Sequence, residues 1–156
     1  MNVLRRNKIF LLTAILCSGL IVTSHAQTKV VVDSIVVSKS EHTLFLMSGK
    51  NVLKTYQIAL GRGSAGIKQV AGDNRTPEGK YIIDEKKIAT KFHKALHISY
   101  PNSDDRARAA KLGKSPGGDI EIHGLPTGLA WLGSLQHVID WTAGCIALSN
   151  DEIDEV

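Results

Sequence analysis

The chain has 156 residues, which is room for one folded domain. Hydrophobic residues make up 43% of it and charged residues 22%, a balance that allows a buried core and argues against intrinsic disorder. The net charge of +4 comes largely from residues 1–26; the rest carries 16 basic and 15 acidic residues, so the charge gives no support for nucleic-acid binding.

Residues 1–26 have the three-part pattern of a secretory signal. Basic residues at positions 5, 6 and 8 precede a mostly apolar run, Ile9–Val22, and small residues stand at positions 24 and 26. The alternative is an uncleaved membrane anchor, but this run of 14 residues is short for a span. We therefore expect cleavage after Ala26, export to the periplasm or cell envelope, and no stable membrane span in the mature chain.

Cleavage would leave a single cysteine. Cys17 lies within the signal, and the bulky Leu16 before it argues against lipid attachment, so Cys145 alone remains. A lone exported thiol cannot form an internal disulfide, which marks Cys145 as a candidate reactive group.

The first part of the mature chain has the composition of an antiparallel sheet. Val30–Ser38 is rich in valine and isoleucine and predicts a strand. Thr43–Met47 and Val52–Leu60 flank a turn at Ser48–Asn51, which predicts a hairpin. Lys80–Asp84 predicts a further strand.

Gly61–Gly79 separates these strands and holds five glycines and a proline. Such punctuation predicts a long ordered loop, and long loops in compact domains are often functional. The glycines do not have the spacing of a phosphate-binding loop.

Phe92–Tyr100 contains His93 and His97, whose spacing would suit a metal site if the segment were helical. The segment ends in Ser99–Pro101, which favours a strand running into a turn. In a strand the two histidines share a face but lie about 13 Å apart. We therefore expect no metal site here.

A helix is expected at Asp105–Leu112, capped by Ser103 and Asp104 and ended by Gly113. Its basic residues are interpreted as a solvated face, with substrate carboxylates as the alternative partners; they are Arg106, Arg108 and Lys111.

Apolar residues at helical spacing predict a second short helix within Trp131–Trp141. Both tryptophans are expected to serve packing, with a sugar platform as the alternative. Ser149–Glu152 has the capping-box pattern and opens a last helix that reaches the end of the sequence at Val156. A helix this short is not stable alone, so the C-terminal end of the domain is expected to be truncated.

The most informative stretch is Gly118–Leu148. It predicts a short strand, Ile120–Ile122, that ends in His123 and Gly124, and a second strand, Ile146–Leu148, that follows Cys145. A thiolate is the reactive form of cysteine, and a nearby imidazole raises its population. Gly144 leaves the backbone beside the sulfur open, so N–H groups there could face an oxyanion.

The residues alone leave an inert alternative open, because a lone cysteine is more often a small buried hydrophobe. The order of the pair, His123 before Cys145, counts against papain-like peptidases.

The motifs resemble those of the L,D-transpeptidase catalytic domain, or YkuD, family. Three pieces match in order: T-P-E-G at Thr76–Gly79, I-H-G at Ile122–Gly124 and T-A-G-C-I at Thr142–Ile146. The resemblance covers about residues 30–156. Many members have a histidine at Ala143 and an arginine or asparagine at Ala147; a subgroup that reads D-W-T-x-G-C-I-A looks like this chain.

The resemblance implies a mostly β, β-sandwich-like fold with a few short helices, and an enzyme acting on peptidoglycan stem peptides without metal or organic cofactor. It implies Cys145 as the nucleophile and His123 as its base and proton donor. Thr142 and Gly124 would support the site, and Gly144 and Cys145 would supply N–H groups to the oxyanion. Ala143 and Ala147 leave open the acceptor, which could be a stem amine, an envelope protein or water.

Two alternatives remain open from the sequence. One is a carboxypeptidase or hydrolase acting on the same linkage. The other is a non-catalytic envelope protein that binds peptidoglycan, with Cys145 buried as a structural residue.

Overall fold

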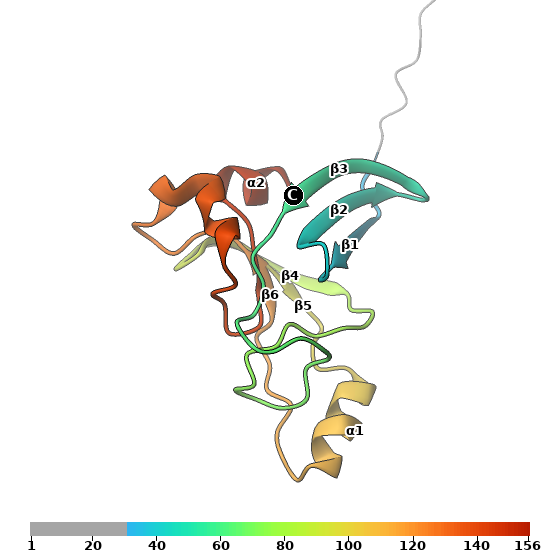
Figure 1. Cartoon of the computed structure of the whole chain (residues 1–156). Helices are drawn as coiled ribbons and strands as arrows, with labels where there is room; N and C mark the ends of the chain where they lie inside the picture. Colours follow the sequence, from blue (N-terminus) through green and yellow to red (C-terminus); the bar gives the residue numbers. More distant parts are fainter. Residues whose placement is uncertain (1–30) are drawn as a thin grey trace, which may run out of the picture.

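The computed structural model describes residues 31–156, which form seven strands in two sheets, two α-helices and one 3-10 helix (Figure 1). The mostly β, β-sandwich-like fold with a few short helices is therefore confirmed. The proposed signal and its cleavage site lie outside the described residues. Within residues 31–156, no helix combines the length and the apolar character needed to cross a bilayer.

The first sheet is an antiparallel meander of β1 (Ser34–Ser38), β2 (Thr43–Ser48) and β3 (Asn51–Gln57). The predicted hairpin is confirmed: Ser48 pairs with Asn51, and Gly49 takes a φ of 57° in the turn. The first strand starts at Ser34 rather than at the predicted Val30.

The second sheet has the order β4-β5-β6-β7, made of β4 (Ile83–Thr90), β5 (His93–Ile98), β6 (Glu121–His123) and β7 (Ile146–Ala147). β4, β5 and β6 are antiparallel, whereas β7 runs parallel to β6. A parallel pair needs a crossover, and residues 124–145 provide it. β4 starts three residues later than predicted and runs to Thr90.

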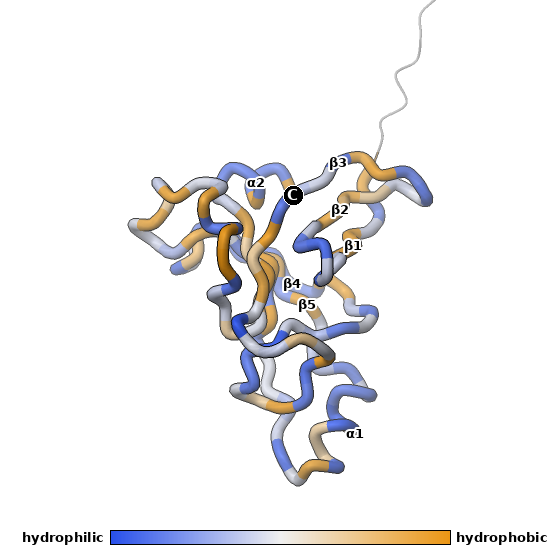
Figure 2. Tube along the Cα trace, in the orientation of Figure 1, coloured by the Kyte–Doolittle hydropathy of each residue, from blue (hydrophilic) through white to orange (hydrophobic). Residues whose placement is uncertain are grey.

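Apolar residues of both sheets form one core. Figure 2 shows hydrophobic residues along the strands and a mainly hydrophilic α1. The buried cluster joins side chains of β2 and β3 to those of β5, β6, β7 and α2; it includes Leu44, Tyr56, Ile58, Leu96, Ile122, Ile146, Leu148 and Ile153. Removal of this apolar surface from water is the main force that holds the sheets together.

The helix α1 (Ser103–Lys111) ends as predicted, with Gly113 at a φ of 62°. Its N-cap is Asn102, not Ser103 or Asp104: the Asn102 side chain accepts bonds from two backbone N–H groups of the first turn. The basic face is only partly solvated, because the Arg108 side chain bonds Asp105 and the Lys68 carbonyl.

The crossover contains η1 (Ala130–Val138), a 3-10 helix interrupted at Gly133, where φ is 48°. The prediction that Trp131 serves packing is wrong, since 74% of it is exposed. The break at Gly133 also interrupts the helical spacing that predicted a single short helix here. The last helix, α2 (Asn150–Glu155), has the predicted capping box between Ser149 and Glu152.

Candidate active site

The pairing of β6 with β7 places His123 and Cys145 on the same face of the sheet. Ile122 lies opposite Ile146 in this parallel pair, and both side chains belong to the buried core. Side chains alternate between the two faces of a sheet, so the residues that flank these isoleucines point to the other face. His123 lies opposite Ala147, so Cys145 precedes its paired position by two residues on that shared face.

The His123 ring packs against two neighbouring aromatic side chains. Phe92 stacks on it with ring centroids 4.3 Å apart, and Trp141 makes an edge-to-face contact with ring centroids 5.7 Å apart. Only 1% of His123 is exposed. This burial lowers the pKa of His123 below its ordinary 6.5, so the ring is neutral at pH 7.

The neutral ring is set in one tautomer. His123 Nδ1 lies 2.7 Å from the Gly124 carbonyl oxygen, which can only accept. Nδ1 therefore carries the hydrogen and Nε2 keeps the lone pair that can take a proton. A Cβ on Gly124 would lie 2.7 Å from the Asn150 side-chain oxygen, so only glycine fits this close packing.

Cys145 is partly buried, and its Sγ lies 3.6 Å from the Asp119 carbonyl oxygen. Burial raises the pKa of the thiol, against a smaller opposing effect of the Glu121 backbone N–H. The Cys145 side chain is thus a neutral thiol and the His123 ring a neutral imidazole, not the thiolate expected from the sequence.

Thr142 closes the turn before Cys145. Its hydroxyl donates to the Cys145 carbonyl at 2.8 Å and accepts from the Gly144 N–H at 3.1 Å. The Gly144 N–H is therefore engaged by Thr142 in this structure and is not free to meet an oxyanion.

The family profile described as the L,D-transpeptidase catalytic domain, YkuD, matches residues 32–156. The chain belongs to the L,D-transpeptidase catalytic domain family.

Two curated Escherichia coli proteins, from strains K12 and O157:H7 and both named "Putative L,D-transpeptidase YafK", are 29% identical to this L,D-transpeptidase domain over 126 residues. The match covers 77% of this chain and 44% of each relative, so the chain spans less than half the length of these relatives. A solved structure, Bd1075 of Bdellovibrio bacteriovorus, matches with a TM-score of 0.49 and 24% identity, covering 78% of this chain and 41% of that one.

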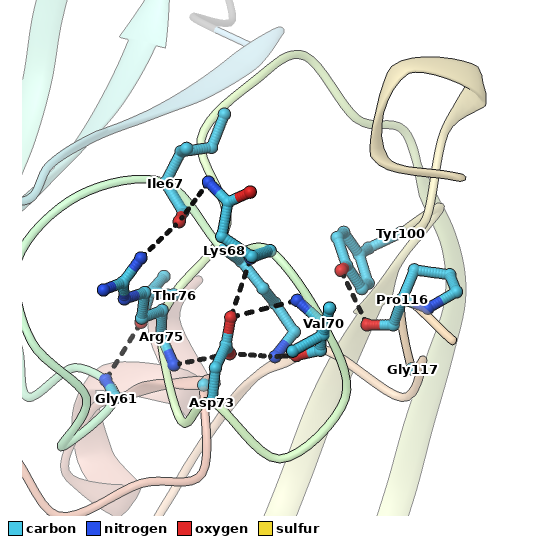
Figure 3. Close-up of polar contacts among 12 residues, drawn as sticks. Gly61, Ile67, Lys68, Val70, Asp73, Arg75, Thr76, Tyr100, Pro116 and Gly117 are labelled. Carbon is cyan, nitrogen blue, oxygen red and sulfur yellow. Dashed lines mark hydrogen bonds and ion pairs between the residues drawn. The ribbon is translucent and has the colours of Figure 1, made fainter. Parts of the chain in front are cut away.

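Hydrogen bonds tie the T-P-E-G segment of this L,D-transpeptidase domain to the chain around the site. Thr76 is buried, and its hydroxyl accepts the Gly61 N–H at 2.9 Å (Figure 3). The Lys39 ammonium donates to the Thr76 carbonyl and to Glu78. The Leu60 carbonyl in turn accepts the Thr142 N–H, which ties the start of the loop to the turn before Cys145.

Sequence reasoning missed two residues in the surroundings of His123, Phe92 and the buried Gln136. The prediction that Trp141 serves packing is confirmed, because its ring packs against His123. The Gln136 amide donates to the Ala147 carbonyl at 3.1 Å and accepts from the Trp141 ring N–H at 3.1 Å. A glutamine among apolar residues of η1 was the available signal, but its buried position depends on the crossover, which the pattern does not reveal.

The two histidines of β5 have separate partners. His93 bonds Asp154 at 2.7 Å and His97 bonds Asp84 at 2.6 Å. Among residues 31–156, no group of three or more side chains suited to bind a metal comes together.

We predict that Phe92→Leu moves the acid limb of Cys145 acylation to higher pH. The base form of His123 is lost as the pH falls through its pKa, which burial holds below 6.5. Loss of the stacked ring admits water and lets this pKa rise toward its ordinary value. Single-turnover acylation rates across pH measure the shift, and Phe45→Leu on β2 is the matched control. An unmoved limb would show that Phe92 does not set the pKa.

We predict that Gly144→Ala destabilises the domain by about 3 kcal/mol. Gly144 has a φ of 131°, and a Cβ there would lie 2.8 Å from the Arg75 carbonyl oxygen. Gly49→Ala is the control, because Gly49 has a φ of 57° with no atom within 4 Å of a new Cβ. Urea denaturation compares the two. Equal losses of free energy of unfolding would contradict the close packing at Gly144.

Proposed function

We propose that this chain is an exported, cysteine-dependent L,D-transpeptidase that acts on peptidoglycan stem peptides. The observation that carries the proposal is the tautomer of His123. The bond from Nδ1 to the Gly124 carbonyl leaves Nε2 as a proton acceptor on the face of the sheet that Cys145 shares. Membership of the family and the names of the curated relatives support the choice of substrate.

The proposed reaction begins with attack of Cys145 Sγ on the carbonyl carbon between the third and fourth stem residues. The thiol proton passes to His123 Nε2. The resulting imidazolium then protonates the leaving D-alanine nitrogen, and a thioester remains. Burial favours this sequence, because both partners are neutral before and after the first half-reaction.

The oxyanion formed during the attack needs backbone donors. We assign the Cys145 N–H to this role. The Gly144 N–H can join it only by leaving the Thr142 hydroxyl, which it bonds at rest. Thr142 thus fixes the shape of the turn before Cys145.

In the second half-reaction an acceptor attacks the thioester. An amine of a neighbouring stem gives a 3→3 cross-link, an envelope-protein amine gives protein attachment, and water gives net carboxypeptidase activity. His123 Nε2 removes the proton of the acceptor in each case. The chemistry requires neither metal nor organic cofactor.

The test is to incubate the purified chain with disaccharide tetrapeptides, alone and with an added amine, and to identify the products by mass spectrometry. Cross-linked dimers or amine adducts are the expected result, and they must be missing with Cys145→Ala. Tripeptide as the sole product would replace the transferase with a hydrolase on the same linkage. Unchanged substrate with folded protein would support the non-catalytic, peptidoglycan-binding alternative.

A further inference from the structure

The loop at residues 61–79 contacts two segments that lead to Cys145 or to its neighbours. On one side the Arg75 carbonyl oxygen would lie 2.8 Å from a Cβ on Gly144, the residue before Cys145. On the other side the Ala71 N–H donates to the Ser115 carbonyl at 2.8 Å. Ser115 opens the segment that leads to Asp119, whose carbonyl lies 3.6 Å from Cys145 Sγ.

One carboxylate organises this loop. Asp73 accepts backbone N–H groups of Gln69 at 2.7 Å, Val70 at 3.1 Å and Arg75 at 3.1 Å (Figure 3). It also accepts the Lys68 ammonium at 2.7 Å. Burial alone would raise the pKa of Asp73, but these hydrogen bonds together hold it well below its usual range.

The partner of this carboxylate is a buried ammonium. Only 3% of Lys68 is exposed, and its Nζ also donates to the Val70 carbonyl at 3.2 Å. Burying an ion pair costs desolvation that its mutual attraction does not reliably offset, so such a pair contributes little net stability. The pair instead fixes the positions of the two side chains, because each buried charge must stay close to its partner.

The positions fixed by this pair also constrain the backbone at Arg75, which lies against Gly144. Arg75 follows Asp73 by two residues, and its side chain bonds the Ser64 hydroxyl and the Ile67 carbonyl of the same loop. A Cβ on Gly63 would lie 2.4 Å from the Asp73 carbonyl oxygen, so backbone meets backbone without intervening side chains. A shift of Asp73 is therefore transmitted to the Arg75 carbonyl and on to Gly144.

We propose that Lys68 and Asp73 are positioning residues for Cys145: their buried ion pair holds the Arg75 carbonyl against Gly144 and the Ala71 N–H against the segment that carries Asp119. The role in acyl transfer rests on the proposed function. The ordering of the turn before Cys145 does not rest on the proposed function, and it can be measured separately.

The test compares Lys68→Met, Asp73→Asn and the double variant in the full chain. Leu44→Ala is the matched control for stability, because Leu44 is fully buried in β2 and lies outside the loop. The first readout is amide hydrogen exchange under native conditions. We expect the protection of the Gly144 and Ala71 N–H groups to fall about tenfold or more in both single variants while the β2 and β3 amides keep theirs.

The second readout is acylation of Cys145 by a carbapenem as a function of its concentration, per folded protein. We expect the maximal rate to fall about tenfold or more in each single variant, with the half-saturating concentration changed less than about threefold. The double variant should be no slower than the slower single variant, because the two residues act as one unit. Leu44→Ala should keep the wild-type rate.

The outcomes separate the two proposals. Unchanged protection of Gly144, or lost protection with unchanged acylation, overturns the positioning role. Opposite effects of the two single variants on the rate would show a charge effect of Lys68 on the thiol in its place. Failure of the wild type to be acylated would count against the proposed function, while lost Gly144 protection would still uphold the ordering by the pair. If both variants fail to fold, Lys68→Arg and Asp73→Glu keep the charges but change the geometry, and wild-type rates in both would overturn the role.

Discussion

Cys145→Ser is expected to abolish the acyl-enzyme and to lower product formation by at least about a thousandfold. A serine hydroxyl gives up its proton far less readily than a thiol, and burial of this position penalises the anion further. The neutral His123, whose pKa burial keeps low, is too weak a base to compensate. Intact mass after incubation with an acyl donor measures the adduct, and disaccharide tetrapeptides measure turnover.

The substitution is nearly isosteric, so the fold should persist. Thermal unfolding of the variant should stay within a few degrees of the wild type, which separates lost chemistry from lost structure. A serine variant that kept a tenth of the wild-type turnover would show that Cys145 is not the nucleophile.

His123→Gln is expected to slow acylation by about 10²- to 10⁴-fold at neutral pH. Glutamine can occupy the space of the imidazole beside Phe92 and Trp141, but it cannot accept the thiol proton or return it to the leaving group. The acid limb of the wild-type pH profile should disappear with the imidazole, and the remaining rate should rise with pH as the thiol ionises without help. Stopped-flow acylation across pH measures both effects.

His97→Gln is the matched control for this variant. His97 lies on β5 and bonds Asp84, outside the Cys145 face, so its loss should change the acylation rate less than about threefold. Equal losses for the two histidine variants would show that His123 acts through the fold and not as the base.

Local patterns predicted the first half of the fold well. Alternation of apolar residues around the turn at Gly49 was enough for the β2–β3 hairpin, because its register is set by neighbours in sequence. The capping box of α2 is equally local. The predicted strand boundaries were wrong where tertiary contacts determine them. For example, β4 begins at Ile83 because pairing with Ile98 of β5 starts there.

The site was predicted in part for the same reason. Gly144 was expected to leave the backbone open toward an oxyanion, whereas the structure shows close packing at both Gly124 and Gly144. The packing around His123 was not predictable, because Phe92 comes from the turn between β4 and β5, Gln136 and Trp141 come from the crossover, and the two segments meet only in the folded chain. The same holds for the proton state of Cys145, which depends on burial and not on its neighbours in sequence.

The buried pair of Lys68 and Asp73 shows a further limit. Within a glycine-rich loop, charged residues five apart read as solvated, and only the folded chain shows that Lys68 is almost fully enclosed. A loop with its own internal ion pair has specific structure that turn signals do not encode.

The most direct test of a cysteine-dependent acyl transfer is the intact mass of the purified chain after incubation with a carbapenem, beside Cys145→Ala. The account predicts a stable adduct of one carbapenem on the wild type, located at Cys145 by peptide mapping, and none on the variant. A folded wild-type chain that stays unmodified, or an adduct that persists on Cys145→Ala, would contradict it.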